Sequence, residues 1–119
     1  MSSEGLAEGE FDISATERAG VPVLSVRGEV DVATAPRLRE SLAALSDASA
    51  AVAVVDLSDV SFVDSTALGV LVSGAKRLRG TGGDLRLVVT EPHIAKVFAI
   101  TGLDEVFDIY RSADQAISA

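Results

Sequence analysis

The fold of this chain is decided by the stretch Asp59-Val60-Ser61-Phe62-Val63-Asp64-Ser65-Thr66-Ala67-Leu68-Gly69-Val70-Leu71-Val72. It sets an Asp-Ser-Thr triplet between a segment typical of a buried strand and a segment with the apolar spacing of a helix. Asp, Ser and Thr are favoured where helices begin. We therefore expect a strand to give way to a helix at this triplet, with the hydroxyl of Ser65 exposed at the positive end of the helix.

The length and composition indicate one compact domain. The 119 residues, 48% of them hydrophobic, suffice for a single core and are too few for two. The first nine residues are small and acidic and show no periodicity. We expect them to form a flexible arm over 1–9, followed by a single domain over 10–119.

The charge narrows the possible partners. A formal net charge of -8 disfavours nonspecific attraction to nucleic acid or to anionic lipid. The chain has no cysteine, no apolar run near the roughly 20 residues that span a bilayer, and no signal-peptide pattern at its start. These features predict a cytoplasmic protein with neither a nucleic-acid nor a membrane partner.

Periodicity predicts strands alternating with helices along the chain. Residues 11–16 alternate as a strand and turn at Ala19-Gly20 into a strand over 21–27. A helix follows, with Thr34 as its candidate cap and its end near Asp47. The remaining predicted elements are a strand over 51–57, a helix over 65–79, a strand over 85–89, a short helix between Pro92 and a left-handed Gly102, a strand over 106–109 and a helix over 113–117.

This alternation predicts an α/β fold. Right-handed crossovers should give a small mixed, mainly parallel sheet of about five strands with about four helices, with the first strand added antiparallel. Ligands and partners of such sheets meet the loops at the carboxyl ends of the strands. Asp31 and Ser65 both follow such ends, and we expect them to share one surface.

The position of Ser65 suits a phosphate. Free N–H groups and the helix dipole at a helix start favour negative charge by about 0.3 to 1 kcal/mol. A phosphoserine beside Asp64 would concentrate negative potential on a small patch and repel a docked protein without melting the helix. For an isolated Asp-Ser-Thr, ordinary helix capping is the more common explanation, and only flanking motifs favour a phosphate site. Thr66 is a second possible acceptor.

Three blocks resemble one known family. The segment 59–72, the upstream segment 28–36 and the downstream Ile100-Thr101-Gly102-Leu103 look like the bacterial anti-sigma factor antagonists, the single-domain STAS proteins. The resemblance implies a regulator without catalytic activity. Its unphosphorylated form would bind an anti-sigma factor that is also a serine kinase, which frees the sigma factor.

The resemblance also implies residue roles. The kinase would phosphorylate Ser65, and a metal-dependent phosphatase would restore it. Asp31 would contribute to partner binding, although an Asx turn also accounts for it. Many members have Gly where this chain has Ala67. Ala should firm the helix start, and it could alter how closely a partner backbone approaches.

The helix after Ser65 presents further candidates. Gly69, Val70 and Ser73 fall away from the apolar stripe of Leu68 and Leu71, so we expect a small-residue contact surface beside Ser65. A bland solvent face is the alternative. The partner-binding prediction comprises Asp31, Asp64, Thr66, Gly69, Val70 and Ser73.

Other function classes have weaker support. STAS domains also serve as adaptors in signalling, transporter and lipid-transport assemblies, and a phospho-aspartate receiver would use Asp56 as acceptor. The chain has one histidine, His93, which follows Pro92 at a predicted helix start, and no cysteine. It therefore lacks the residues expected for a metal cluster or a Ser-His-Asp triad. We expect no enzyme activity, no metal and no cofactor.

Overall fold

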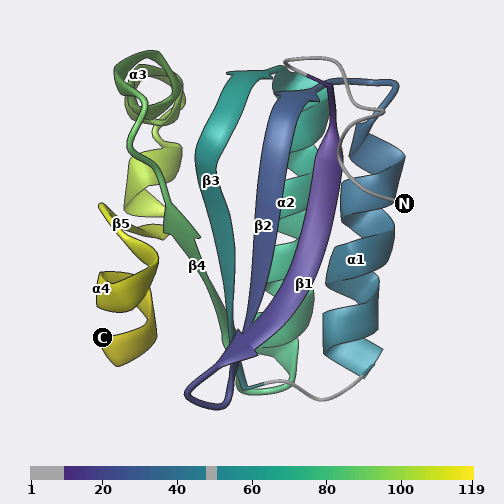
Figure 1. Ribbon diagram of the computed structural model, residues 1–119, viewed down its shortest axis with the longest axis vertical. Helices are drawn as coiled ribbons and strands as arrows, with labels where there is room; N and C mark the ends of the chain where they lie inside the picture. Colours follow the sequence, from purple (N-terminus) through teal and green to yellow (C-terminus); the bar gives the residue numbers. More distant parts are fainter. Residues whose placement is uncertain (1–9, 48–50) are drawn as a thin grey trace.

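The sheet is mixed and mainly parallel, as predicted. The computed structural model describes residues 10–47 and 51–119, so the arm predicted over 1–9 lies outside the described residues. Only β1 and β2 pair antiparallel. The strands lie in the order β1-β2-β3-β4-β5 (Figure 1), and their bounds are Asp12–Arg18, Val21–Val30, Val52–Val63, Asp84–Val88 and Asp108–Tyr110.

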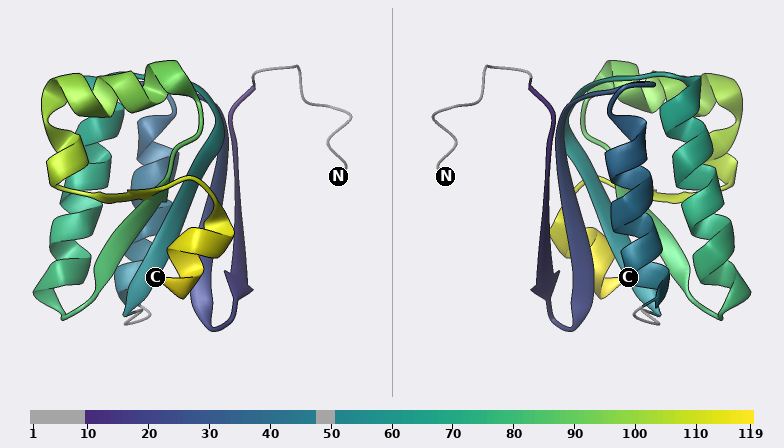
Figure 2. Two further views of the ribbon diagram at one scale, coloured as in Figure 1. Left: turned by 90° about the vertical axis from the view of Figure 1, so that its left-hand side faces the viewer. Right: turned by 90° about the vertical axis from the view of Figure 1, so that its right-hand side faces the viewer.

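Helices cover both faces of the sheet (Figures 1 and 2). On one face lie α1 (Ala35–Asp47) and α2 (Ser65–Gly80), which bury their apolar side chains in the main core. On the other face, α4 (Ala113–Ser118) packs Ala116 into a smaller cluster. None of the helices in the described part of the chain is long and apolar enough to cross a membrane.

The α3 helix (Pro92–Thr101) begins and ends as predicted. Pro92 stands in its first turn, and Gly102 ends it with a φ of 77°. That conformation suits glycine, which lacks the Cβ that would clash. A short 3-10 turn, η2 (Leu103–Glu105), follows and was not predicted.

Two predicted strands prove longer. β2 and β3 run to Val30 and Val63, beyond the predicted ends at 27 and 57. Their pairing shifts register between Ser25 and Arg27 and again after Gly28. Such irregularities allow strand pairing to continue through residues that do not alternate strictly between apolar and polar. A prediction based on alternation therefore ended both strands too early.

The last strand was predicted too early. The expected range 106–109 is replaced by Asp108–Tyr110. Phe107 is buried, and its ring packs edge-on against Phe98 with centroids 6.1 Å apart. The residues before it form a turn, because the N–H groups of Val106 and Phe107 both donate hydrogen bonds to the carbonyl oxygen of Leu103. The strand can therefore begin only after Phe107.

Candidate functional site

The turns that follow β2 and β3 lie side by side at one end of the sheet. The N–H of Asp64 donates a 3.2 Å hydrogen bond to the carbonyl oxygen of Val30. Figure 1 shows α1 and α2 both starting at this end, with α3 at the same end. The expectation that the two turns share one surface is confirmed. We call this surface, formed by residues 28–34 and 61–66, the Ser65 edge.

Asp64 caps α2. Its backbone is extended, and its carboxylate oxygen Oδ1 accepts a 2.9 Å hydrogen bond from the N–H of Ala67. The carbonyl of Asp64 accepts from the N–H of Leu68 at 3.1 Å. Capping therefore accounts for Asp64 by itself, and the cap fixes where the next residue points.

Ser65 is the first residue of α2, and it is exposed. Thr66 is half-buried, and Ala67 is 0% exposed within the main core. The hydroxyl of Ser65 is thus the accessible one of the pair. The methyl group of Ala67 faces inward, so it cannot itself obstruct a partner backbone.

The small-residue surface on α2 is narrower than predicted. Gly69 and Ser73 are exposed, but the prediction that Val70 lies on the surface is wrong, because only 3% of it is exposed. The α2 helix packs against α1 as well as the sheet, so its buried face extends beyond a single apolar stripe. Val70 lies on the α1 side, where it shares a pocket with Leu42.

Asp31 holds the turn between β2 and α1. Its Oδ1 accepts hydrogen bonds from the N–H groups of Ala33 at 2.9 Å and Thr34 at 3.2 Å. The hydroxyl of Thr34 donates to the carbonyl of Glu29 and accepts from the N–H of Asp31, both at 2.9 Å. The hydroxyl of Thr34 was predicted to cap α1, but it bonds instead to the backbone of Glu29 and Asp31 within the preceding turn. Within residues 10–47 and 51–119, all hydrogen bonds that the Asp31 carboxylate accepts go to Oδ1.

Two exposed apolar side chains at the Ser65 edge were missed. Val32 is 71% exposed in the turn after β2, and Phe62 is 47% exposed near the end of β3. Phe62 could have been found from sequence. Phe62 and Val63 are adjacent in a strand, so the pleat can bury only one of them, and Val63 is the buried one. Large apolar groups on a surface rimmed by polar residues often mark protein contacts.

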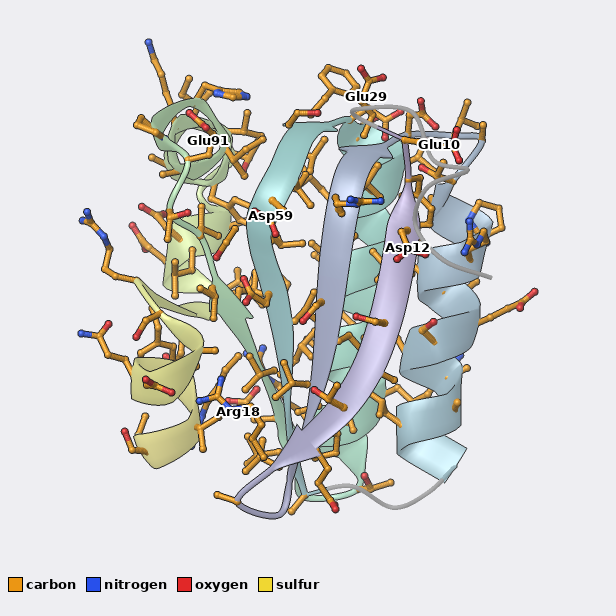
Figure 3. The ribbon with its side chains drawn as sticks, in the orientation of Figure 1. Glu10, Asp12, Arg18, Glu29, Asp59 and Glu91 are labelled. Atoms are coloured by element: carbon orange, nitrogen blue, oxygen red, sulfur yellow. The ribbon has the colours of Figure 1, made fainter. Side chains whose placement is uncertain are left out.

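Acidic side chains surround these apolar groups. Figure 3 shows Glu29 at the end of β2, with Glu10 and Glu91 at the same end of the molecule. Glu29 and Glu10 are exposed and Glu91 is half-buried. Together with Asp31 and Asp64, they place five carboxylates at this end of the molecule, of which that of Glu91 lies 3.1 Å from His93.

His93 links α3 to the Ser65 edge. Its Nε2 lies 2.8 Å from the carbonyl oxygen of Ser61, and its Nδ1 lies 3.1 Å from Oε1 of Glu91. A carbonyl can only accept, so Nε2 carries a proton in either charge state. The bond to Ser61, followed by the Glu91 carboxylate, raises the pKa of His93 above its ordinary value of 6.5.

Asp56 lies away from this edge. It sits in the middle of β3 opposite Val88, where its Oδ1 accepts from the N–H of Ser58 at 2.9 Å and from the Ser58 hydroxyl at 2.6 Å. These two local hydrogen bonds within the strand account for the carboxylate of Asp56. Among the residues that the structure describes, no group of three or more His, Cys, Asp or Glu side chains could hold a metal ion, so the acidic cluster that a receiver requires is not found there.

Comparison with known proteins gives consistent matches. Residues 12–116 match the family model of the STAS domain. An anti-sigma-B factor antagonist of Bacillus subtilis (strain 168) is 37% identical over 94 residues, which cover 79% of this chain and 85% of that protein. An anti-sigma-B factor antagonist of Listeria monocytogenes is 38% identical over 84 residues, which cover 71% of this chain and 74% of that protein. The crystal structure of an anti-sigma factor antagonist from Mycobacterium paratuberculosis is 32% identical, covers 94% of this chain and 95% of that chain, and superposes with a TM-score of 0.86.

Proposed function

This chain belongs to the STAS domain family, and we propose that it acts as an anti-sigma factor antagonist that phosphorylation of Ser65 switches off. The names of its relatives favour this reading over that of an adaptor in a transporter or lipid-transport assembly. The observation that carries the proposal is the exposed hydroxyl of Ser65 at the start of α2, directly after the Asp64 cap.

The unphosphorylated form docks through the Ser65 edge. Val32 and Phe62 supply apolar contact area, and the exposed Gly69 lets a partner backbone approach the first turns of α2. Asp31, Asp64 and Thr66 supply polar groups around them. The partner is an anti-sigma factor with serine kinase activity, and its capture by this chain frees the sigma factor.

The phosphoryl transfer has simple chemistry. The partner positions ATP so that Oγ of Ser65 attacks the γ-phosphorus; the bond to ADP breaks as the Oγ–P bond forms, and a base on the kinase takes the hydroxyl proton. A metal-dependent phosphatase reverses the modification by adding water and releasing inorganic phosphate. This chain contributes only the acceptor and its position, and it needs no catalytic group of its own.

The phosphate acts on the interface and leaves the fold intact. The N–H groups of Ser65 and Thr66 have no acceptor within the helix, and the dipole of α2 favours an anion there. After transfer, however, a group of about -1.5 to -2 charges faces both Asp64 and the nucleotide phosphates held by the kinase. Like charges forced together across an interface cost several kcal/mol, on the order of a hundredfold in affinity, which suffices to release the partner.

Affinity purification from the chain's own cells tests the proposal. The tagged full chain should recover an anti-sigma factor of the serine kinase type, and mass spectrometry should find phosphate on Ser65 rather than Thr66. A Ser65→Ala variant should recover the kinase and carry no phosphate. Recovery of a transporter or signalling scaffold without a kinase would favour the adaptor reading, and modification of Asp56 by acetyl phosphate would revive the receiver.

A further inference from the structure

A surface pocket of about 160 Å³ lies between α1 and α2. Its apolar floor includes Leu42 and Val70, and Ser73 and Gly74 lie beside them. The helices meet closely here, because a Cβ on Gly74 would lie 2.8 Å from Cδ1 of Leu42. The shape of the pocket is therefore fixed by packed backbone and buried side chains.

Two arginines from different helices flank the pocket. Arg39 comes from α1 and Arg77 from α2, and both are exposed. Over residues 10–47 and 51–119, neither side chain forms an ion pair or a hydrogen bond. By contrast, Arg79 pairs with Asp84, and Arg86 donates to the carbonyl of Ala116.

These charges are unexpected in so acidic a chain. With a net charge of -8, carboxylates are plentiful, yet none lines this pocket. The dipole of α2 explains a cation in its last turn, but it does not explain Arg39 on the second helix facing the same hollow. Two arginines that line one pocket suit a carboxylate, which each guanidinium group can hold through a charge-assisted bond.

A row of exposed residues on α2 connects the Ser65 edge with the pocket. Ser65, Gly69, Ser73 and Arg77 recur at intervals of four residues along α2, and all four are exposed. Residues at this spacing form one ridge of a helix, which winds by about 120° around the axis as it advances about 18 Å from the first residue to the last. A segment docked at Ser65 and following this ridge therefore reaches the pocket.

We propose that this Arg39–Arg77 pocket receives an Asp or Glu side chain from an acidic segment of the same anti-sigma factor that docks at Ser65. The inference rests on the proposed function, and it assigns a second contact of opposite charge. The Ser65 edge is acidic, whereas the pocket is basic. A partner must therefore match both ends of α2, which fixes its orientation on the helix and contributes specificity.

Charge reversal in the full-length chain tests this contact. Arg39→Glu and Arg77→Glu should each weaken binding of the purified anti-sigma kinase by about tenfold or more, since truncated or reversed arginine anchors rank among the costliest interface changes. Lys76→Glu is the matched control. It makes the same charge change on the same turn of α2, but Lys76 does not line the pocket, so its effect should stay within about threefold.

Each result has a defined meaning. Equal losses in the Lys76 variant and the pocket variants would indicate general attraction and overturn the proposal. Full-strength binding by both pocket variants would also overturn it, and if Ser65→Asp still lost binding in the same assay, the proposed function would stand without the pocket. Deletion of residues 1–9 could also tighten binding in the natural chain but not in the Arg39→Glu variant. In that case the chain's own acidic N-terminal segment, and not the partner, would occupy the pocket.

Discussion

The Nε2 atom of His93 lies 2.8 Å from the carbonyl oxygen of Ser61, so α3 holds the end of the strand that leads to Ser65. The pairing of β3 with β4 ends at Asp56 and Val88. β3 continues beyond the end of β4, and there the imidazole of His93 donates a hydrogen bond to the carbonyl of Ser61 in place of a β4 backbone group. The approach to Ser65 is therefore supported from α3 as well as from β2.

His93 should make stability depend on pH. Its folded-state pKa is raised above 6.5, so its stabilising effect is complete below about pH 6.5 and is lost as the pH rises through the folded-state value. His93→Gln keeps an N–H donor for Ser61 but does not titrate. Melting temperatures measured against pH should show a decline above about pH 6.5 in the natural chain that the variant lacks. Parallel curves would contradict this role for His93.

Loss of the α2 cap should lower stability. Asp64→Ala removes the acceptor for the N–H of Ala67, and it should reduce the free energy of unfolding by about 1 kcal/mol in urea titrations. Asp64→Asn retains an oxygen acceptor and serves as the control, with a smaller loss. An unchanged urea midpoint for the alanine variant would show that the cap contributes nothing.

Ala67→Gly should separate stability from binding. The change increases backbone freedom and removes a buried methyl group, so we expect a loss of about 1 kcal/mol in the free energy of unfolding. Because the methyl group is 0% exposed, the affinity for the anti-sigma kinase should not change under conditions where both forms are folded. A changed affinity would show that this position does affect the interface.

Two glycines of α2 should respond differently to alanine. A Cβ on Gly69 meets nothing within 4 Å, so Gly69→Ala should stabilise the chain by about 0.5 to 1 kcal/mol through helix propensity. Gly74→Ala gains the same propensity but crowds Leu42, and overpacking costs about 1 to 3 kcal/mol. Gly69→Ala should also weaken partner binding, because it adds a methyl group to the contact face. Equal stability changes in the two variants would contradict the close approach at Gly74.

Sequence periodicity predicted the element types and the sheet, because apolar residues repeat about every two positions in a strand and about every 3.6 positions in a helix. It failed where tertiary contacts override periodicity. Val70 is buried by a second helix, and the ends of β2 and β3 depend on register shifts between strands. The arginine pair at the pocket was hidden for the same reason. Arg39 and Arg77 are far apart in the chain, and only the packing of α1 on α2 brings them to one hollow.

The affinity of the anti-sigma kinase for the chain with and without phosphate on Ser65 tests the central claim most directly. The chain is phosphorylated to completion, and both forms are titrated calorimetrically while their melting temperatures are recorded. We predict a loss of affinity on the order of a hundredfold with little change in melting temperature, since the charge acts on the interface. Equal affinities for the two forms, or a loss of affinity that arises from unfolding of the phosphorylated chain, would contradict the account.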